Sequence, residues 1–455
     1  MNNIFAATSS AANTTHRHHA KIAIIGGGSL YCAELMRSFV NHAEALRGCH
    51  IILMDVDVDN LELIYTIGSK LFLQAEVDLA LERTTVREEA IDDADFVLTT
   101  FRIGGLQARH LDETIPLRHG LIGQDTIGPG GFFYALRTAP VVAGIAAEIE
   151  KVAPKAFMLN YMNPSNVVTE AISHSSGIRV IGLSNSHART LEQFALAAGV
   201  AAPAGKRLYP RTVGLSPGNW TTAVWRDGVD VLPQIVEWSQ HYINSPSEGN
   251  AMNYEQELLA TLTAHYGSIP SHYMHYYYFP ERMLEFLQKK PASYAANLLA
   301  ELPAIVAHYR EESQKDIPRL TKVHDNGAPG DFVVEILASI LNDTGDEWIL
   351  NVPNKGSINF LDDDRVVELP CRVDARGATP LTQGDGGLEI DQTGLIALLA
   401  EYEGATAKAA LWGTRRDAIK ALAANPLVMS YSKAEQVYDD LAAAHANYLP
   451  ARLLK

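Results

Sequence analysis

Residues 21–31, KIAIIGGGSLY, constrain the fold more than any other part of the chain. KIAII is typical of a buried strand, and the residues after the glycines are typical of a helix. Gly26 permits a tight turn, and Gly28 lets the backbone approach a pyrophosphate closely. A helix that begins there offers free N–H groups and a partial positive charge. The stretch therefore predicts a dinucleotide-binding turn, with contacts from Gly26, Gly28, Ser29 and Leu30.

An acidic residue lies at the end of the next predicted strand. That strand reads HIILMDVD and carries Asp55. An acid at this place accepts hydrogen bonds from a ribose diol, and its charge disfavours a 2′-phosphate. We therefore expect NAD rather than NADP. The third glycine of the usual fingerprint is absent, with Tyr31 in its place. A glycine-rich turn without a cofactor is the alternative.

Short apolar runs alternate with helical patterns up to about residue 200. Strands are expected at KIAIIG, HIILMDVD, ADFVLTTF, AFMLNYMN and RVIGLSN, with helices such as 29–42, 60–74 and 139–152 between them. Continuous apolar strands that alternate with helices predict a parallel sheet covered on both faces. We expect residues 21–200 to form an α/β domain, a Rossmann-type doubly wound parallel sheet.

The pattern becomes less regular after the segment AAGVAAPAGKRLYP, which marks a plausible domain boundary. At 455 residues the chain is also too long for a single core. Longer helical patterns, interrupted by strand-like pieces such as RVVELPCRV, predict an α+β domain over 201–455 for substrate binding and oligomerisation. Residues 1–20 are small and polar, and we expect a disordered tail there.

Composition excludes several kinds of partner. A net charge of −16 argues against nucleic acid. No apolar run approaches the roughly 18–20 residues that cross a membrane, and residues 1–20 lack the apolar core of a secretory signal. Cys32, Cys49 and Cys371 are far apart and form no disulfide framework. We expect a cytoplasmic protein that acts on a small molecule.

Four later segments carry a family resemblance. They are FRIGGLQARHLDETIPLRHGLIGQDTIGPGGFFYALRT at 101–138, NYMNPSNVVTEA at 160–171, IPSHYMHYYY at 269–278 and NVPNKGSINFLDDDRVVELPCRV at 351–373. Together, and in this order, they resemble the NAD-dependent glycosidases of glycoside hydrolase family 4, and look closest to its 6-phospho-β-glucosidase branch. The resemblance implies a lactate/malate dehydrogenase-like fold and a homodimer or homotetramer.

The resemblance also implies an unusual mechanism for glycoside cleavage. NAD oxidises the C3 hydroxyl of the sugar to a ketone, which acidifies the proton on C2. A base removes that proton and the C1 substituent leaves by elimination. Water then adds, C3 is reduced again, and the cofactor is regenerated in each turnover.

Candidate site residues follow from these segments. Tyr273 lies where the IP-x-x-Y motif of the family places its base, although packing within a tyrosine-rich helix is the alternative. Arg102 and Asp125 lie in polar loops beyond strand ends, where α/β sites form. Lys355 is expected on the surface. The catalytic candidates are Tyr273, Asp125 and His187; the cofactor-binding candidates are Gly26, Gly28, Ser29, Leu30, Asp55, Arg102 and Asn160; the substrate-binding candidates are Asn163, Arg102 and Asn354.

The sequence departs from the family where a divalent metal, typically manganese, is implied. The cysteine ligand belongs to a G-L-C-N motif that here reads GLSN, with Ser184, and the histidine ligand to a G-L-N-H motif that reads GLSP, with Pro217. His187 could substitute as a ligand or, protonated, as the donor to an enolate. Alternatively, the chain is an NAD-dependent sugar or hydroxy-acid dehydrogenase. A third possibility is an inactive protein that only binds nucleotide, and such a protein would not bring Tyr273 and Asp125 to one pocket.

A second departure concerns the sugar phosphate. Phospho-sugar members commonly show an R-G-G-A stretch, whereas residues 324–328 here read HDNGA. Asp325 would repel a 6-phosphate. The expected substrate is therefore a small glycoside, with or without a 6-phosphate.

Overall fold

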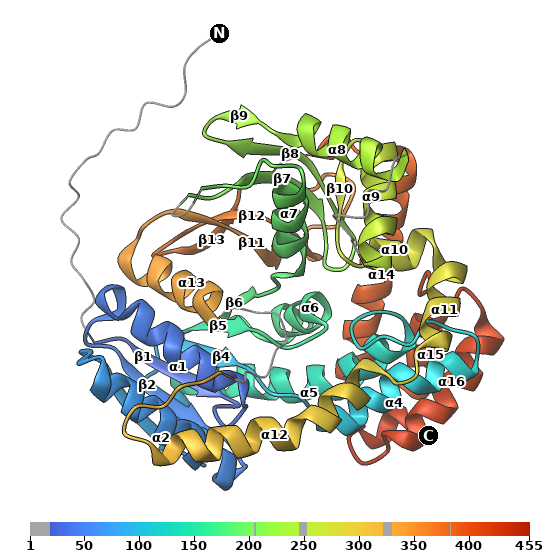
Figure 1. Cartoon of the computed structure of the whole chain (residues 1–455). Helices are drawn as coiled ribbons and strands as arrows, with labels where there is room; N and C mark the ends of the chain where they lie inside the picture. Colours follow the sequence, from blue (N-terminus) through green and yellow to red (C-terminus); the bar gives the residue numbers. More distant parts are fainter. Residues whose placement is uncertain (1–18, 204–205, 245–252, 322–329, 383) are drawn as a thin grey trace.

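β1 (Lys21–Ile25) shows why the chain builds a covered sheet. In this computed structural model, Ile22 and Ile24 pack into one hydrophobic cluster, whereas Ala23 and Ile25 pack into another on the opposite face. A strand that is apolar on both sides requires cover on both faces. α1 (Tyr31–Asn41) and α13 (Gly330–Asn342) lie over one face, and α5 (Gly128–Val152) lies over the other (Figure 1).

The structure describes residues 19–203, 206–244, 253–321, 330–382 and 384–455. Nearly all of the expected tail at 1–20 lies outside these ranges. The HDNGA stretch at 324–328, with Asp325, also lies outside them.

Six parallel strands form the centre of the sheet, in the spatial order β6-β5-β4-β1-β2-β3. The order reverses between β1 and β4, which is the place where open α/β sheets bind ligands beyond the carboxyl ends of their strands. The other strands of this group are β2 (His50–Met54), β3 (Ala80–Thr84), β4 (Phe96–Thr99), β5 (Phe157–Asn160) and β6 (Arg179–Gly182).

Three strands from the second half extend the same sheet. β11 (Asp346–Pro353) pairs antiparallel with β6, followed by β12 (Val366–Asp374) and β13 (Gly377–Pro380). The described part of the sheet thus has nine strands, and it crosses the boundary expected near residue 200. The two halves share one sheet.

A smaller antiparallel sheet lies above the large one in Figure 1 and packs against helices of the second half. Its core includes the fully buried Trp220 and the side chains of Phe194 and Ile235. Its strands are β7 (Tyr209–Gly214), β8 (Asn219–Arg226), β9 (Val229–Asp230) and β10 (Ile269–Pro270).

The C-terminal helices pack on α5 at the lower right of Figure 1. Phe132 and Phe133 of α5 contact Tyr438. Burial of each such large side chain contributes about 1.5–3 kcal/mol to the free energy of folding. α5 is the one described helix that is long and apolar enough to span a membrane, but 67% of the relevant window is buried inside the protein. It is a core helix.

The longer helical patterns of the second half form helices, as expected. The remaining helices are α2 (Val58–Gln74), α3 (Arg87–Ile91), α4 (Gly105–Arg118), α6 (Ser165–Ser175), α7 (Ser186–Ala197), α8 (Leu232–Asn244), α9 (Tyr254–Tyr266), α10 (Met274–Tyr278), α11 (Pro280–Lys289), α12 (Tyr294–Gln314), α14 (Ile390–Trp412), α15 (Arg415–Ala423) and α16 (Tyr431–Ala444), with 3-10 turns η1 (Ala43–Leu46) and η2 (Ala451–Leu453).

Candidate active site

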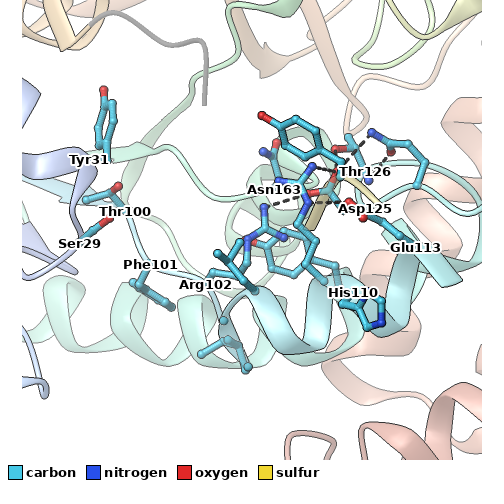
Figure 2. Close-up of a pocket in the computed structure, with 18 of the residues that line it drawn as sticks. Ser29, Tyr31, Thr100, Phe101, Arg102, His110, Glu113, Asp125, Thr126 and Asn163 are labelled. Carbon is cyan, nitrogen blue, oxygen red and sulfur yellow. Dashed lines mark hydrogen bonds and ion pairs between the residues drawn. The ribbon is translucent and has the colours of Figure 1, made fainter. Parts of the chain in front are cut away.

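A cavity of about 1370 Å³ opens at the carboxyl ends of the parallel strands. The loops after β1, β2, β4, β5 and β6 line one side of it, and residues 272–276 and 287–294 of the second half line the other. Figure 2 shows Ser29, Tyr31 and Thr100 at one end, with Arg102, Asp125 and Asn163 at the other. The volume is large enough for a dinucleotide and a sugar together.

The glycine turn after β1 has the geometry that the sequence predicts. Gly26 has φ +97°, and a Cβ built there would lie 2.4 Å from the Thr100 carbonyl oxygen. A Cβ on Gly28 would lie 3.0 Å from the Asp55 carboxylate. Side chains are excluded at both positions, so the backbone of the turn borders the cavity directly. This turn fits a pyrophosphate.

Asp55 has two roles at the nucleotide end. One carboxylate oxygen accepts a hydrogen bond from the Gly28 N–H at 3.0 Å, and the other accepts one from the Asp57 N–H at 3.0 Å. Asp57 in turn caps α2 through the N–H of Asn60. Because Asp55 also lines the cavity, it holds the glycine turn in place and leaves a carboxylate beside the space for a ribose.

Two arginines hold Asp125 on the opposite side of the cavity. Arg102 donates to one carboxylate oxygen at 2.9 Å, and Arg109 approaches the other at 3.2 Å (Figure 2). Burial opposes ionisation, but the Arg109 and Arg102 guanidiniums outweigh it and hold the pKa of Asp125 below its usual value. Asp125 is therefore a carboxylate at neutral pH. Its charge is neutralised by the arginines, which argues against a role as a general base.

Tyr273 lies at the start of α10 and lines the same cavity as Asp125. Burial raises the pKa of its phenol to about 12, while a hydrogen bond with Thr126 and the charge of Arg109 act to lower it. Asn163, before a cis peptide bond to Pro164, also lines the cavity. Tyr273 and Asp125 therefore lie at one cavity, which is not expected of a protein that only binds nucleotide.

Several predicted residues do not reach the cavity. The Asn160 side chain is buried and bonds within its own strand-end turn, receiving the Met162 N–H and donating to Thr169. The buried Asn354 amide donates to carbonyls of its own loop, such as that of Leu361 at 2.9 Å. Leu30 packs into the core below α1. These three residues shape loops, and no contact of theirs with a ligand is expected; Lys355 has φ +45° in an exposed turn, as predicted.

His187 lies away from the cavity and is not placed to stabilise an enolate. Its ring is 1% exposed, and its Nε2 meets the Thr221 hydroxyl at 2.7 Å. Burial lowers the pKa of His187 to about 3, so the imidazole is neutral at neutral pH. The expectation of a protonated donor disagrees with this placement, because a desolvated histidine without an acidic partner does not hold a proton.

Ser184 lines the cavity at the end of β6 and has a buried carboxyl group behind it. Its hydroxyl lies 3.2 Å from that of Ser186. Glu368 of β12 is 1% exposed and accepts a hydrogen bond from the Asn219 amide. Burial raises the pKa of Glu368 to about 8, although the polar side chains of Ser184 and Asn219 act to lower it. Sequence reasoning missed Glu368 because 184 residues separate the two.

The residues present do not fit the metal that the family resemblance implies. Ser184 contributes only a hydroxyl, and Pro217 has no donor side chain and does not line the cavity. His187 points to Thr221 instead. Within the described ranges no three His, Cys, Asp or Glu side chains form a group that could hold a metal ion. Manganese prefers carboxylate, carbonyl and water oxygens, and the two expected ligand positions supply only the Ser184 hydroxyl.

Other cavity residues were not anticipated. Arg189, in the first turn of α7, and His272, next to Tyr273, both line the cavity. So does Arg109, which pairs with Glu113 at 2.8 Å as well as with Asp125. The four-residue spacing of Arg109 and Glu113 on a helix is the signal that could have found this pair.

Comparisons with known proteins agree with this geometry. Residues 21–200 match the model of family 4 glycosyl hydrolases, and residues 213–428 match that of the family 4 glycosyl hydrolase C-terminal domain. A probable 6-phospho-β-glucosidase of Bacillus subtilis (strain 168) is 34% identical, covering 94% of this chain and 97% of the relative.

Two solved structures support the fold. A 6-phospho-β-glucosidase from Thermotoga maritima, in complex with manganese, NAD⁺ and glucose-6-phosphate, aligns with a TM-score of 0.80 and 26% identity over 94% of this chain and 99% of that chain. Malate dehydrogenase from Plasmodium falciparum aligns with a TM-score of 0.54 and 13% identity over 86% of this chain and 99% of that chain, which bears on the fold alone.

The predicted α/β Rossmann-type fold is confirmed, and so is the prediction of an NAD-dependent glycosidase. The shared family models, relatives and architecture lead to one conclusion: the chain belongs to glycosyl hydrolase family 4.

Proposed function

We propose that this chain cleaves 6-phosphorylated β-glucosides, with NAD held in the cavity as a catalyst. The observation that carries the proposal is that one cavity is lined by the glycine turn and Asp55 at one end and by Tyr273 at the other. The relatives named 6-phospho-β-glucosidase support the substrate class.

At the nucleotide end, Gly26, Gly28 and Ser29 would face the pyrophosphate, and Asp55 would face the ribose. The N-terminus of α1 adds partial positive charge there. Bound NAD supplies a hydride acceptor for C3 of the sugar and returns the hydride at the end of the turnover. Tyr31 fills the place of the third fingerprint glycine and packs its ring on Tyr161 at 5.5 Å.

At the sugar end, Tyr273 takes the proton from C2 once C3 is a ketone. A neutral phenol is a weak base, so the reaction depends on positive charge that favours the phenolate. Arg109 acts in this direction, against burial and the Asp125 carboxylate, which together keep the pKa of Tyr273 raised to about 12. Arg102 and Asn163 line the same region and are suited to hold sugar hydroxyls. Asp125 fixes the two arginines in position.

Cationic side chains at the cavity suit an anionic substrate despite the negative charge of the whole chain. Lys290 lines the cavity, with its Nζ 3.8 Å from Glu255 and 4.4 Å from the centre of the Phe286 ring, and Arg189 lines it from α7. We propose that this side of the cavity receives the 6-phosphate.

The cellular setting and assembly are also proposals. Cys32, Cys49 and Cys371 are buried free thiols, which suits a reducing cytoplasm. We propose a homodimer or homotetramer, to be tested by light scattering of the purified protein.

The test uses 4-nitrophenyl glucosides with and without a 6-phosphate, in both anomeric forms. With NAD present, we expect release of nitrophenol from the 6-phospho-β-glucoside and no net accumulation of NADH. Removal of NAD should abolish release. Stoichiometric NADH without released nitrophenol would indicate a dehydrogenase and overturn the proposal.

A further inference from the structure

The loop between α11 and α12, residues 290–293, borders the cavity and leads into an exposed tyrosine. Lys290 and Ser293 of this loop line the cavity, and so does Tyr294, the first residue of α12. Tyr294 is 50% exposed, whereas Tyr134 and Tyr276, which line the same cavity, are 2% and 6% exposed. An exposed aromatic ring on the wall of a polar cavity offers apolar surface to a ligand.

Two hydrogen bonds fix this loop to α4. They involve the α4 side chains His110 and Glu113 (Figure 2). His110 Nδ1 lies 2.9 Å from Ser293 Oγ, and the Ala295 N–H donates to Glu113 Oε2 at 2.8 Å. The loop and the start of α12 are therefore held in place before any substrate binds, which lowers the entropic cost of binding there.

Tyr294 is connected to the sugar end of the cavity through Arg109. The Arg109 guanidinium lies over the Tyr294 ring, 4.7 Å from its centre, and one of its nitrogens lies 3.2 Å from Asp125. A cation held against one face of an aromatic ring helps to fix the orientation of that ring. One arginine therefore separates the exposed ring from Asp125, which lines the cavity together with Tyr273.

The charges around the ring suit an uncharged ligand. Arg102 and Arg109 balance the carboxylates of Glu113 and Asp125 through three ion pairs. Lys290, on the side proposed for the 6-phosphate, lies at the other end of the loop and approaches α9. A pyranose presents a face of C–H bonds that packs on an aromatic ring, and hydroxyls at its edge that meet polar groups. The loop thus has a cationic end and an aromatic end.

We propose that Tyr294 is the platform of a subsite for the leaving group, and that the preferred leaving group is a second pyranose. The inference rests on the proposed function and deepens it. With the phosphorylated sugar beside Tyr273, its 6-phosphate extends toward Lys290, and the group on C1 packs on the Tyr294 ring. The substrate class is then a β-linked disaccharide with a 6-phosphate on its non-reducing sugar, rather than a glycoside with a small alkyl group on C1.

The test compares three 6-phospho-β-glucosides that carry methyl, 4-nitrophenyl or glucosyl on C1, with release of glucose 6-phosphate as the readout. A contact made equally in the bound substrate and in the transition state affects KM and leaves kcat unchanged. We expect Tyr294→Ala to raise KM for the two ring-bearing substrates about 10-fold. KM for the methyl glycoside should change by less than about twofold, because methyl does not reach the ring.

Two more variants separate the ring from its bulk. Tyr294→Phe keeps the aromatic face and should restore most of the affinity for the ring-bearing substrates. Tyr294→Leu keeps apolar bulk without a flat face and should behave like Tyr294→Ala, so the comparison stands even if the alanine variant does not fold. Melting temperatures establish which variants are folded.

A matched control is Tyr431→Ala. Tyr431 is 53% exposed and, like Tyr294, is the first residue of a helix with a serine N-cap, but it does not line the cavity. The control should have the wild-type KM for all three substrates.

An equal rise in KM for the methyl and ring-bearing substrates would show that Tyr294 only holds Arg109 in place, and would overturn the subsite. A rise found in Tyr448→Ala alone would place the leaving group at a second exposed tyrosine of the cavity and would also overturn it. A wild type that cleaves none of the three substrates overturns the proposed function. A wild type that cleaves all three, with KM values matched by Tyr294→Ala, overturns this inference alone.

Discussion

Substitution of Gly28 by alanine tests the nucleotide end of the cavity directly. The new Cβ would lie 3.0 Å from the Asp55 Cγ and Oδ2 atoms and 3.0 Å from the Leu61 N atom. Ordinary contacts begin near 3.4 Å, so the Asp55 carboxylate must move by a few tenths of an ångström. That movement breaks the hydrogen bond from the Gly28 N–H and displaces the oxygen offered to the ribose.

The magnitude follows from the hydrogen bond to the ribose that the displaced Asp55 carboxylate would lose. Hydrogen bonds to charged groups contribute about 1.5–3 kcal/mol. Because each 1.4 kcal/mol is a factor of about ten in affinity, Gly28→Ala should weaken NAD binding roughly 10- to 150-fold. The fold should persist, because the φ of Gly28 lies outside the left-handed region that alanine avoids. Gly26→Ala, at φ +97° and 2.4 Å from a carbonyl oxygen, should instead destabilise the whole domain.

Isothermal titration of NAD into the purified variants gives the affinities. Gly144→Ala is the matched control, because Gly144 lies inside α5 with no atom within 4 Å of its Cβ position. It should bind NAD normally and gain about 0.5–1 kcal/mol of stability. Wild-type affinity in Gly28→Ala would refute the reasoning that this glycine makes room for the cofactor.

Three further predictions concern the sugar end and the buried charges. Tyr273→Phe should lower kcat by about 100-fold or more without changing NAD affinity. Tyr266 lies outside the cavity, so the control Tyr266→Phe should be as active as the wild type. A Tyr273→Phe variant with the wild-type rate would show that Tyr273 is not the base. Asp125→Asn leaves Arg102 and Arg109 without their anion and should cost about 3–5 kcal/mol of unfolding free energy. Because the pKa of Asp125 is lowered in the folded state, its contribution to the free energy of unfolding is present above about pH 4 and is lost as the pH falls through that lower pKa. The wild type should therefore lose this stabilisation in acid, and the variant should not. His187→Gln should retain activity and should lose less stability than the wild type as the pH falls from about 6.5 towards 3. The reason is that His187 binds a proton in the unfolded chain over this range, whereas its buried ring stays neutral in the folded chain. Denaturant melts at several pH values measure this difference, and equal pH dependence in the two proteins would show that His187 is protonated when folded.

The nucleotide end was predictable because its chemistry is local. The glycine turn, the start of α1 and the acid after β2 all lie within about 35 residues, and each is fixed by strand-to-helix geometry. The sheet order at the switch point then explains why Arg102 and Asn163, which follow β4 and β5, reach the same cavity.

The sugar end was harder because polar side chains have two uses. Asn160 and Asn354 have the residue type of ligand-binding groups, but their amides satisfy buried backbone groups in tight loops. His187 lies three residues after Ser184, yet the helix turns its ring to Thr221. Glu368 comes near the end of β6 only because β11 and β12 join the edge of the first sheet, where Asn351 pairs with both Glu368 and Gly182. Nothing local in the sequence encodes that pairing.

The most direct test of the central claim follows the substrate rather than the enzyme. The 6-phospho-β-glucoside is made with deuterium at C2, and its cleavage by the NAD-loaded enzyme is timed while NADH absorbance is monitored. Removal of the C2 proton predicts a slower rate for the deuterated substrate, a product that has lost deuterium to water, and no net NADH. A product that keeps all its deuterium would contradict the account, because direct hydrolysis never breaks the C2–H bond.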